Sequence, residues 1–150
     1  MEHNIVIIPT DGSKYSKSSA EVGFEFAKKI DATVHALSVG ETDPVHRSSI
    51  GGSASQSEAE ITETASEWAS ELATAAETYG LETEVVVRTG TPAEEISAYA
   101  GEVDADMIVM GTAGRSGFER TVVGGVTDKV VRTAPVPVVT VRPDGTVDAF

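Results

Sequence analysis

Apolar residues along this chain follow two different periods. Short apolar runs rich in β-branched residues occupy residues 4–9, 33–39, 83–88, 107–110 and 136–141, and such runs are typical of strands covered on both faces. Apolar residues recur every three or four positions in residues 16–30, 58–79 and 92–100, as along one face of a helix, and residues 126–132 form a shorter helical segment. This alternation predicts a single-domain α/β fold, an open five-stranded parallel sheet with helices on both faces.

Turn residues punctuate the pattern. Thr91, Pro92 and Glu94 give the third long helix an N-cap, a first-turn proline and an acidic residue in the first turn. Gly101 is expected to lie beyond the end of that helix. Pro137 cannot donate a hydrogen bond to a neighbouring strand, so the fifth strand is expected at an edge of the sheet.

Residues 40–57 are rich in glycine and serine and show no apolar period, so a long mobile loop is predicted there. Such a loop serves as a lid or as a binding segment, or is disordered, and the sequence does not choose between these roles. The domain is expected to span residues 1–143, with residues 144–150 as a loose C-terminal tail.

Composition narrows the class of protein. A chain of 150 residues with 40% hydrophobic residues fits one soluble globular domain, and no apolar run approaches the ~20 residues that span a bilayer. The first residues, MEHNIVII, lack the basic region and long apolar segment of a secretory signal, so a cytoplasmic location is expected. The chain has no cysteine, which excludes disulfides and thiolate metal sites.

The formal net charge is −13, from 24 acidic and 11 basic residues. This balance argues against general attraction to nucleic acid or to an anionic membrane. Two interpretations of the acidity stay open. It suits a salt-rich, halophile-like cytoplasm, where salt screens the repulsion between surface carboxylates, or it is that of an ordinary acidic protein.

A glycine-rich loop follows the fourth predicted strand. Five glycines lie between residues 111 and 125, where they let the backbone turn and approach a ligand closely. The last helix starts next to Gly124 and Gly125, so its unpaired N–H groups and positive dipole end would face a bound ligand. Residues 111–132 contain four basic and two acidic residues on an otherwise acidic chain. An anionic ligand such as a phosphate is therefore favoured over glycines that serve only as turns.

In an open parallel sheet, ligands bind beyond the carboxyl ends of the strands, where the winding direction reverses. If the strand order is 3-2-1-4-5, that point lies between the first and fourth strands, and Asp11 in the turn after the first strand would face the glycine loop. Asp11 either binds a ribose hydroxyl or a metal ion beside phosphates, or stabilises the turn and caps the first helix together with Ser13. The residues alone leave both roles open.

Other signatures are weak. The chain contains no Walker A sequence, and no G-x-G-x-x-G follows the first strand, so dinucleotide binding is disfavoured. His3, His35 and His46 are too scattered to predict a metal site. Neither Ser38 nor Ser116 has an evident His–Asp relay, so no hydrolytic triad and no catalytic residue is expected.

Together these residues resemble the universal stress protein family over essentially the whole chain. Gly111 and Gly114, followed after nine residues by Gly124, fit the motif G-x2-G-x9-G-[ST] of its ATP-binding members. Supporting matches are PTDGS at 9–13, TPAEEI at 91–96, ADMIVMGTAGRSG at 105–117 and APVPVVTVR at 134–142. The resemblance implies a Rossmann-like, adenine nucleotide alpha hydrolase-like sheet of order 3-2-1-4-5, and a homodimer paired through the fifth strand.

The resemblance also implies ATP as the ligand, with Mg²⁺ or Mn²⁺ carried by the nucleotide near Asp11. By this analogy Asp11 approaches the ribose, and Ser38 or Val39 lies by the adenine. The implied nucleotide-binding residues are Pro9, Thr10, Asp11, Ser38, Val39, Met110, Gly111, Gly114, Arg115, Ser116, Gly124, Gly125, Val126 and Thr127. The implied dimer interface consists of Val136, Val138, Val139 and Val141.

Gly125 departs from the family motif, which has Ser or Thr at that position. A phosphate oxygen would lose a hydroxyl donor worth roughly 0.5–1.5 kcal/mol, and Thr127 is the candidate to replace it in part. The preferred interpretation is an ATP-binding regulatory or sensor protein of the stress response with little or no turnover. The alternatives are a dimeric interaction scaffold that binds no nucleotide and, third, a slow ATPase or autophosphorylating enzyme.

Overall fold

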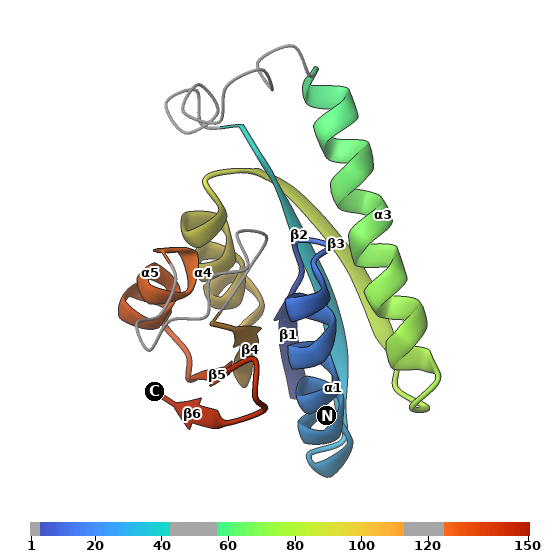
Figure 1. Cartoon of the computed structure of the whole chain (residues 1–150), viewed down its shortest axis with the longest axis vertical. Helices are drawn as coiled ribbons and strands as arrows, with labels where there is room; N and C mark the ends of the chain where they lie inside the picture. The colour runs from blue at the N-terminus through green and yellow to red at the C-terminus, as the bar shows by residue number, and fades with distance from the viewer. Residues whose placement is uncertain (1–3, 43–56, 113–124) are drawn as a thin grey trace.

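The structure, a computed structural model, describes residues 4–42, 57–112 and 125–150 of the chain. Strands and helices alternate along most of this length (Figure 1). Their order is β1 (Asn4–Pro9), α1 (Lys14–Lys29), β2 (Ala32–Glu41), α3 (Glu58–Glu77), β3 (Thr83–Gly90), α4 (Pro92–Val103), β4 (Met107–Gly111), α5 (Gly125–Thr133), β5 (Val138–Val141) and β6 (Val147–Ala149).

These strands form one sheet of order β3-β2-β1-β4-β5-β6. The strands from β3 to β5 are parallel to their neighbours, whereas β6 runs antiparallel to β5. The predicted α/β class and the predicted order of the first five strands are therefore confirmed, and the sheet gains a sixth strand.

The sixth strand corrects two expectations about the chain end. Residues 144–150 are not a loose tail, because Val147–Ala149 pairs with β5. The fifth strand is consequently not the edge of the sheet. Pro137 lies just before β5, where it removes no hydrogen bond of that strand, and its carbonyl accepts from Ile108 N at 3.0 Å.

A tight turn reverses the chain between β5 and β6. Gly145 donates its backbone N–H to the Arg142 carbonyl at 2.8 Å, and its φ of +91° lies in the left-handed region that favours glycine. Arg142 also pairs with Asp148 across the hairpin at 3.0 Å. The sequence Asp144-Gly145 is a strong hairpin signal, and it accounts for the reversal.

Helices cover both faces of the sheet, as predicted (Figure 1). Successive strand residues point to opposite faces, so Val6 and Ile8 pack with α1 and α3, whereas Ile7 packs with α4 and α5. On the face covered by α1 and α3, the core includes the buried side chains of Phe24 and Leu72. The sheet is therefore buried between two helical layers, which explains its continuous apolar strands.

Two helix ends differ from their predicted positions. α4 continues through Gly101 and ends at Asp104, whose φ of 53° makes it the left-handed cap. Gly101 was expected beyond the helix, and this is wrong because its backbone stays helical. α3 begins with a capping box, in which Ser57 Oγ accepts from Glu60 N at 3.1 Å and Glu60 Oε1 accepts from Ser57 N at 3.0 Å.

The predicted mobile loop at 40–57 is shorter at both ends. Gly40 and Glu41 complete β2, and Ser57 is the N-cap of α3. Residues 43–56 lie outside the described residues, so the prediction of mobility stays a prediction.

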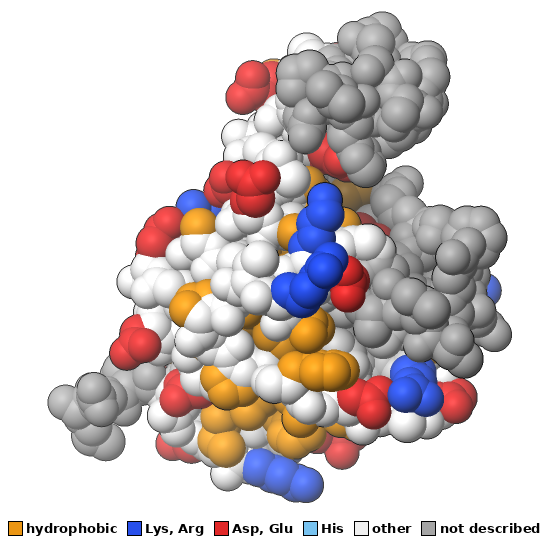
Figure 2. Space-filling view, turned by 90° about the vertical axis from the view of Figure 1, so that its left-hand side faces the viewer, with side chains coloured by type: hydrophobic (Ala, Val, Ile, Leu, Met, Phe, Trp, Pro, Cys, Tyr) orange, Lys and Arg blue, Asp and Glu red, His pale blue; other side chains and the backbone are white. Residues whose placement is uncertain are grey.

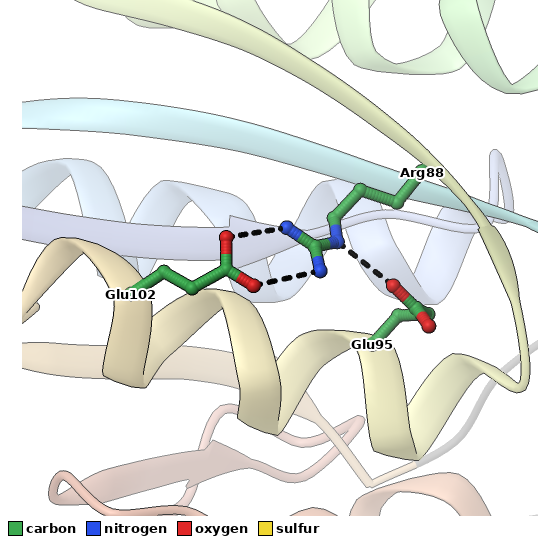
Figure 3. Close-up of polar contacts among 3 residues, drawn as sticks. All are labelled: Arg88, Glu95 and Glu102. Atoms are coloured by element: carbon green, nitrogen blue, oxygen red, sulfur yellow. Dashed lines mark hydrogen bonds and ion pairs between the residues drawn. The ribbon is translucent and has the colours of Figure 1, made fainter.

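An ion-pair cluster fastens strand β3 to helix α4 (Figure 3). Arg88 donates from Nε to Glu95 at 2.9 Å and from both terminal nitrogens to Glu102 at 2.9 and 3.0 Å. Its guanidinium also lies over the Tyr99 ring, 5.5 Å from the centroid. The hydrogen bonds between Arg88 and Glu102 raise the pKa of Arg88 and lower the pKa of Glu102, so this pair stays charged at neutral pH.

In the described part of the chain, none of the helices combines the length and the apolar character that crossing a membrane requires.

Candidate functional site

The candidate site lies where the winding of the sheet reverses. β1 pairs with β2 on one side and with β4 on the other, with Ile7 opposite His35 and Ile108. The helix that follows β1, α1, lies on one face of the sheet. The helix that follows β4, α5, lies on the opposite face. The exits of β1 and β4 therefore meet at the switch point, where open α/β sheets bind ligands.

The exit of β1 is tied to β2 by two hydrogen bonds. Thr10 N donates to the Leu37 carbonyl at 2.9 Å, and Ser38 Oγ donates to the Thr10 carbonyl at 3.0 Å. Thr10 and Ser38 are buried, while Pro9 and Val39 are half-buried. Four of the expected nucleotide-binding residues, Pro9, Thr10, Ser38 and Val39, therefore lie side by side at the ends of β1 and β2.

Asp11 organises the turn between β1 and α1. Its Oδ1 accepts from Ser13 N at 3.0 Å and from Ser16 Oγ at 2.6 Å, and Ser13 is the N-cap of α1. Gly12 between them has a φ of +80°. The turn-stabilising role of Asp11 is therefore present in the structure, and a ribose or metal role would be added to it.

The exit of β4 is tied to the first turn of α5. Thr127 Oγ1 donates to the Gly111 carbonyl at 2.7 Å, and Thr127 and Met110 are buried. The hydroxyl proton of Thr127 is engaged in this bond, so Thr127 can replace the missing motif hydroxyl only by giving it up. α5 starts at Gly125, so the backbone N–H of Gly125 is one of the first-turn donors that have no partner within the helix itself.

Space remains around the start of α5. A Cβ added at Gly125 would meet nothing within 4 Å, and the neighbouring Val126 side chain is 40% exposed. The described residues therefore leave space beside Gly125 at the start of α5. Gly114, Arg115, Ser116 and Gly124, the other expected phosphate-side residues, lie outside the described residues.

Three of the four expected dimer-interface residues lie in β5, and Val136 precedes that strand. Val138, Val139 and Val141 are buried, and Val136 is half-buried. The outer edge of β5 pairs with β6 of the same chain, with Val141 opposite Val147 and Val139 opposite Ala149.

One residue at the site was not assigned to it by sequence reasoning. Trp68 of α3 falls on the helical apolar stripe and was interpreted as core, but its indole is half-buried and lies against Gly12. Helical spacing shows which side of α3 Trp68 occupies, and it cannot show that this side reaches the β1–α1 turn.

A histidine with a lowered pKa lies within β2, away from the exits of β1 and β4. His35 Nδ1 is 2.6 Å from the Tyr99 hydroxyl, and burial lowers the His35 pKa although nearby Glu84 opposes the shift. This pair joins β2 to α4 and has a structural role. Among the described residues, no group of three or more His, Asp or Glu side chains is arranged to hold a metal ion.

The sequence of this chain is similar to those of universal stress proteins. The sequence profile of the universal stress protein family matches residues 2–142. The chain is 34% identical over 137 residues to universal stress protein MJ0531 of Methanocaldococcus jannaschii, covering 91% of this chain and 81% of that protein. It is 32% identical over 146 residues to universal stress protein YxiE of Bacillus subtilis, covering 93% and 99%.

Solved structures share the fold. The structure of hypothetical protein MJ0577 covers 97% of this chain and 100% of its own, with a TM-score of 0.80 and 22% identity. A universal stress protein from Archaeoglobus fulgidus was solved in complex with dAMP; it covers 93% of this chain and 97% of its own, with a TM-score of 0.63 and 22% identity. Another universal stress protein was solved in complex with cAMP and covers 95% and 98%, with a TM-score of 0.67 and 21% identity.

Proposed function

The chain belongs to the universal stress protein family, and we propose that it is an ATP-binding, regulatory member with little or no turnover. The observation that carries the proposal is the meeting of two exits at the switch point. The Asp11 turn after β1 and the start of α5 after β4 converge there, so one ligand can reach a carboxylate and a row of backbone donors.

The parts of ATP match the chemistry of these two exits. The negative phosphates suit the N–H groups and positive dipole end of α5, and the open space at Gly125 leaves room for them. The ribose hydroxyls suit the Asp11 carboxylate, and the adenine suits the half-buried Val39 beside Ser38. Mg²⁺ or Mn²⁺ would arrive with the phosphates and neutralise part of their charge.

The comparisons support an adenine nucleotide as the ligand class. Two structurally similar family members were solved with dAMP and with cAMP, both of which carry adenine, a pentose and phosphate. ATP extends the same pattern by two phosphates, toward the glycine loop whose spacing fits the ATP-binding motif.

A regulatory role with little turnover fits the state of Asp11. Its Oδ1 accepts two hydrogen bonds within the turn, from Ser13 and Ser16, so the carboxylate has a structural role in the fold that requires no turnover. Binding would instead change the stability of the Asp11 turn and of α5, a change that a partner can recognise.

The alternative function is a scaffold that binds no nucleotide. It is favoured by Gly125, which lacks the motif hydroxyl, and by the engagement of Thr127 with Gly111. The proposed homodimer and cytoplasmic location are common to both functions. Because β6 covers the outer edge of β5, a direct β5–β5 contact would require β6 to leave, whereas pairing at the free edge of β6 would not.

The two functions are distinguished by the nucleotide that the protein retains. The full chain is incubated with a mixture of ATP and GTP, freed of unbound nucleotide, denatured, and the released nucleotide is identified by chromatography. Retention of ATP over GTP, lost in Gly124→Val, is the expected result. Retention of neither nucleotide supports the scaffold. Phosphate release by the wild type faster than by Gly124→Val would contradict the proposed lack of turnover.

A further inference from the structure

Helix α3 contributes an aromatic side chain to the Asp11 turn. Trp68 is the only tryptophan of the chain. A Cβ placed on Gly12 would come within 2.6 Å of the indole atoms Nε1, Cε2 and Cδ1, so the five-membered part of the ring lies directly on the Gly12 backbone. Any residue larger than glycine at position 12 would displace the indole or the turn.

This contact is fixed from both sides. On the side of α3, Ala65 and Ala69 flank Trp68 on the helix and are fully buried, and Leu72 one turn further is 7% exposed. Two turns before Trp68, Ile61 packs so closely on Gly40 of β2 that a Cβ there would lie 2.7 Å from its Cγ2. α3 is therefore anchored over the exit of β2, which holds the backbone of Trp68 beside the Asp11 turn.

On the side of the turn, Gly12 lies between Asp11 and Ser13, which both stabilise the start of α1. Asp11 accepts the hydrogen bonds that shape the turn, and Ser13 caps α1. Gly12 N donates to Thr10 Oγ1 at 3.1 Å, and its φ of +80° is accessible to glycine and to few other residues. Gly12 has no side chain of its own to restrain this conformation, and the indole of Trp68 packs on its backbone.

We propose that Trp68 is a positioning residue of the nucleotide site: by packing on Gly12 it holds the β1–α1 turn in the conformation that presents Asp11 to the ribose. This inference rests on the proposed function and adds a third element, α3, to a site otherwise built from the exits of β1 and β4. The indole raises affinity for the nucleoside end of the ligand and leaves the phosphate end unaffected, because α5 lies on the opposite face of the sheet.

The experiment measures ligand affinities of the full chain by calorimetry. Trp68→Ala is expected to weaken ATP binding about 10-fold, since a turn that must be ordered on binding adds its entropy to the cost, while Trp68→Phe restores most of the affinity. Affinity for inorganic triphosphate, which has no ribose, is expected to be the same in wild type and both variants. Tyr79→Ala is the matched control: it removes an aromatic side chain that packs on Phe24 beyond the far end of α3 and does not touch the Asp11 turn, so ATP affinity stays unchanged.

A second measurement uses the wild-type protein alone. Because Trp68 is the only tryptophan and lies on the turn, its fluorescence is expected to change when ATP binds and to stay constant with inorganic triphosphate. This measurement decides the matter if Trp68→Ala does not fold.

The outcomes separate the two claims. Unchanged ATP affinity in Trp68→Ala, an equal loss for triphosphate, or a fluorescence that ignores ATP overturns the role of Trp68 while ATP binding stands. If wild type binds no ATP at all, the proposed function fails and the role of Trp68 fails with it.

Discussion

At the scale of single residues, the phosphate side of the site depends on what stands at position 125. Glycine there leaves the start of α5 open, since a Cβ would meet nothing within 4 Å, but it supplies no hydroxyl. Thr127 does not compensate, because its hydroxyl already donates to the Gly111 carbonyl at 2.7 Å. The departure from the motif is therefore a missing contact rather than a blocked site.

This difference predicts that Gly125→Ser binds ATP more tightly than wild type. The added hydroxyl would contribute about 0.5–1.5 kcal/mol, equivalent to about a 2- to 10-fold lower Kd by calorimetry. Gly125→Ala is the matched control, because it adds the same Cβ without the hydroxyl. Equal affinities of the Ser and Ala variants would show that the missing hydroxyl is irrelevant.

His35 predicts a pH dependence of stability. Burial lowers its pKa in the folded state, whereas the unfolded chain takes up the proton near pH 6.5. The free energy of unfolding therefore falls as pH drops below about 6.5 and levels off below the folded-state pKa. Glu84 opposes the shift, and Tyr99 contacts the ring from α4.

His35→Asn tests this dependence, because asparagine can still contact the Tyr99 hydroxyl but does not titrate. Urea unfolding of both proteins at pH about 7.5 and about 5.5 is the measurement, a window that lies above the titration of Glu60 and Glu102, whose pKa values are lowered. A smaller loss of stability in the variant is expected. Identical losses would mean that His35 titrates alike in the folded and unfolded chain.

At the scale of elements, the strands and most helices were predictable because their patterns are strong. A continuous apolar run such as residues 4–9 is typical of a strand buried on both faces of a sheet, and β1 is such a strand. Gly101 misled the prediction because a glycine is tolerated inside a helix when tertiary packing continues it, here with Pro135 3.4 Å from its notional Cβ. The start of α3 at Ser57, three residues before Glu60, carries a capping signature that the apolar period alone does not reveal.

The candidate site was predictable only in part. The strand order implied by the family resemblance predicts that the exits of β1, with Asp11, and of β4 are neighbours, and the sheet has that order. The contact of Trp68 with Gly12 joins residues 56 positions apart on different elements, and no local pattern encodes it. The hairpin of β5 and β6 was missed because a three-residue strand is too short to show alternation, although Asp144-Gly145 marks its turn.

The β5–β6 hairpin predicts what removal of the chain end would do. Truncation after Arg142 deletes β6, breaks the Arg142–Asp148 ion pair and exposes the backbone edge of β5, an apolar strand. Unpaired apolar edges recruit other chains, so the truncated protein is expected to self-associate more than the full chain in sedimentation velocity. Phe150→Ser, which keeps β6 and removes a side chain that is 58% exposed, is the control. Truncation without change in mass or melting temperature would show that β6 protects nothing.

At the scale of the whole molecule, the chain combines an acidic balance with an apolar face. Figure 2 shows the side of the molecule on which α5 and β6 lie in Figure 1, and apolar side chains gather in its lower half between charged groups. Val147 and Phe150 near the chain end are 42% and 58% exposed. A homodimer formed at the free edge of β6 would cover this region and leave the switch point open on the same sheet.

The net charge of −13 predicts that salt stabilises the protein. Raising KCl from about 0.1 M to about 3 M shortens the screening length to a few ångströms and removes most repulsion between carboxylates, so the melting temperature is expected to rise. Sucrose at matched osmolality controls for solvent exclusion. A melting temperature that is equal or higher at low salt would contradict salt adaptation and leave the acidity that of an ordinary acidic protein.

ATP binding at the switch point is the central claim, and calorimetry on nucleotide-free full-length protein tests it most directly. ATP is titrated into wild type and into Gly124→Val, whose added side chain would block the phosphate side. The account predicts saturable binding of about one ATP per chain in wild type and its loss in the variant. Absence of saturable heat in wild type, or unchanged affinity in Gly124→Val, would contradict the site described above.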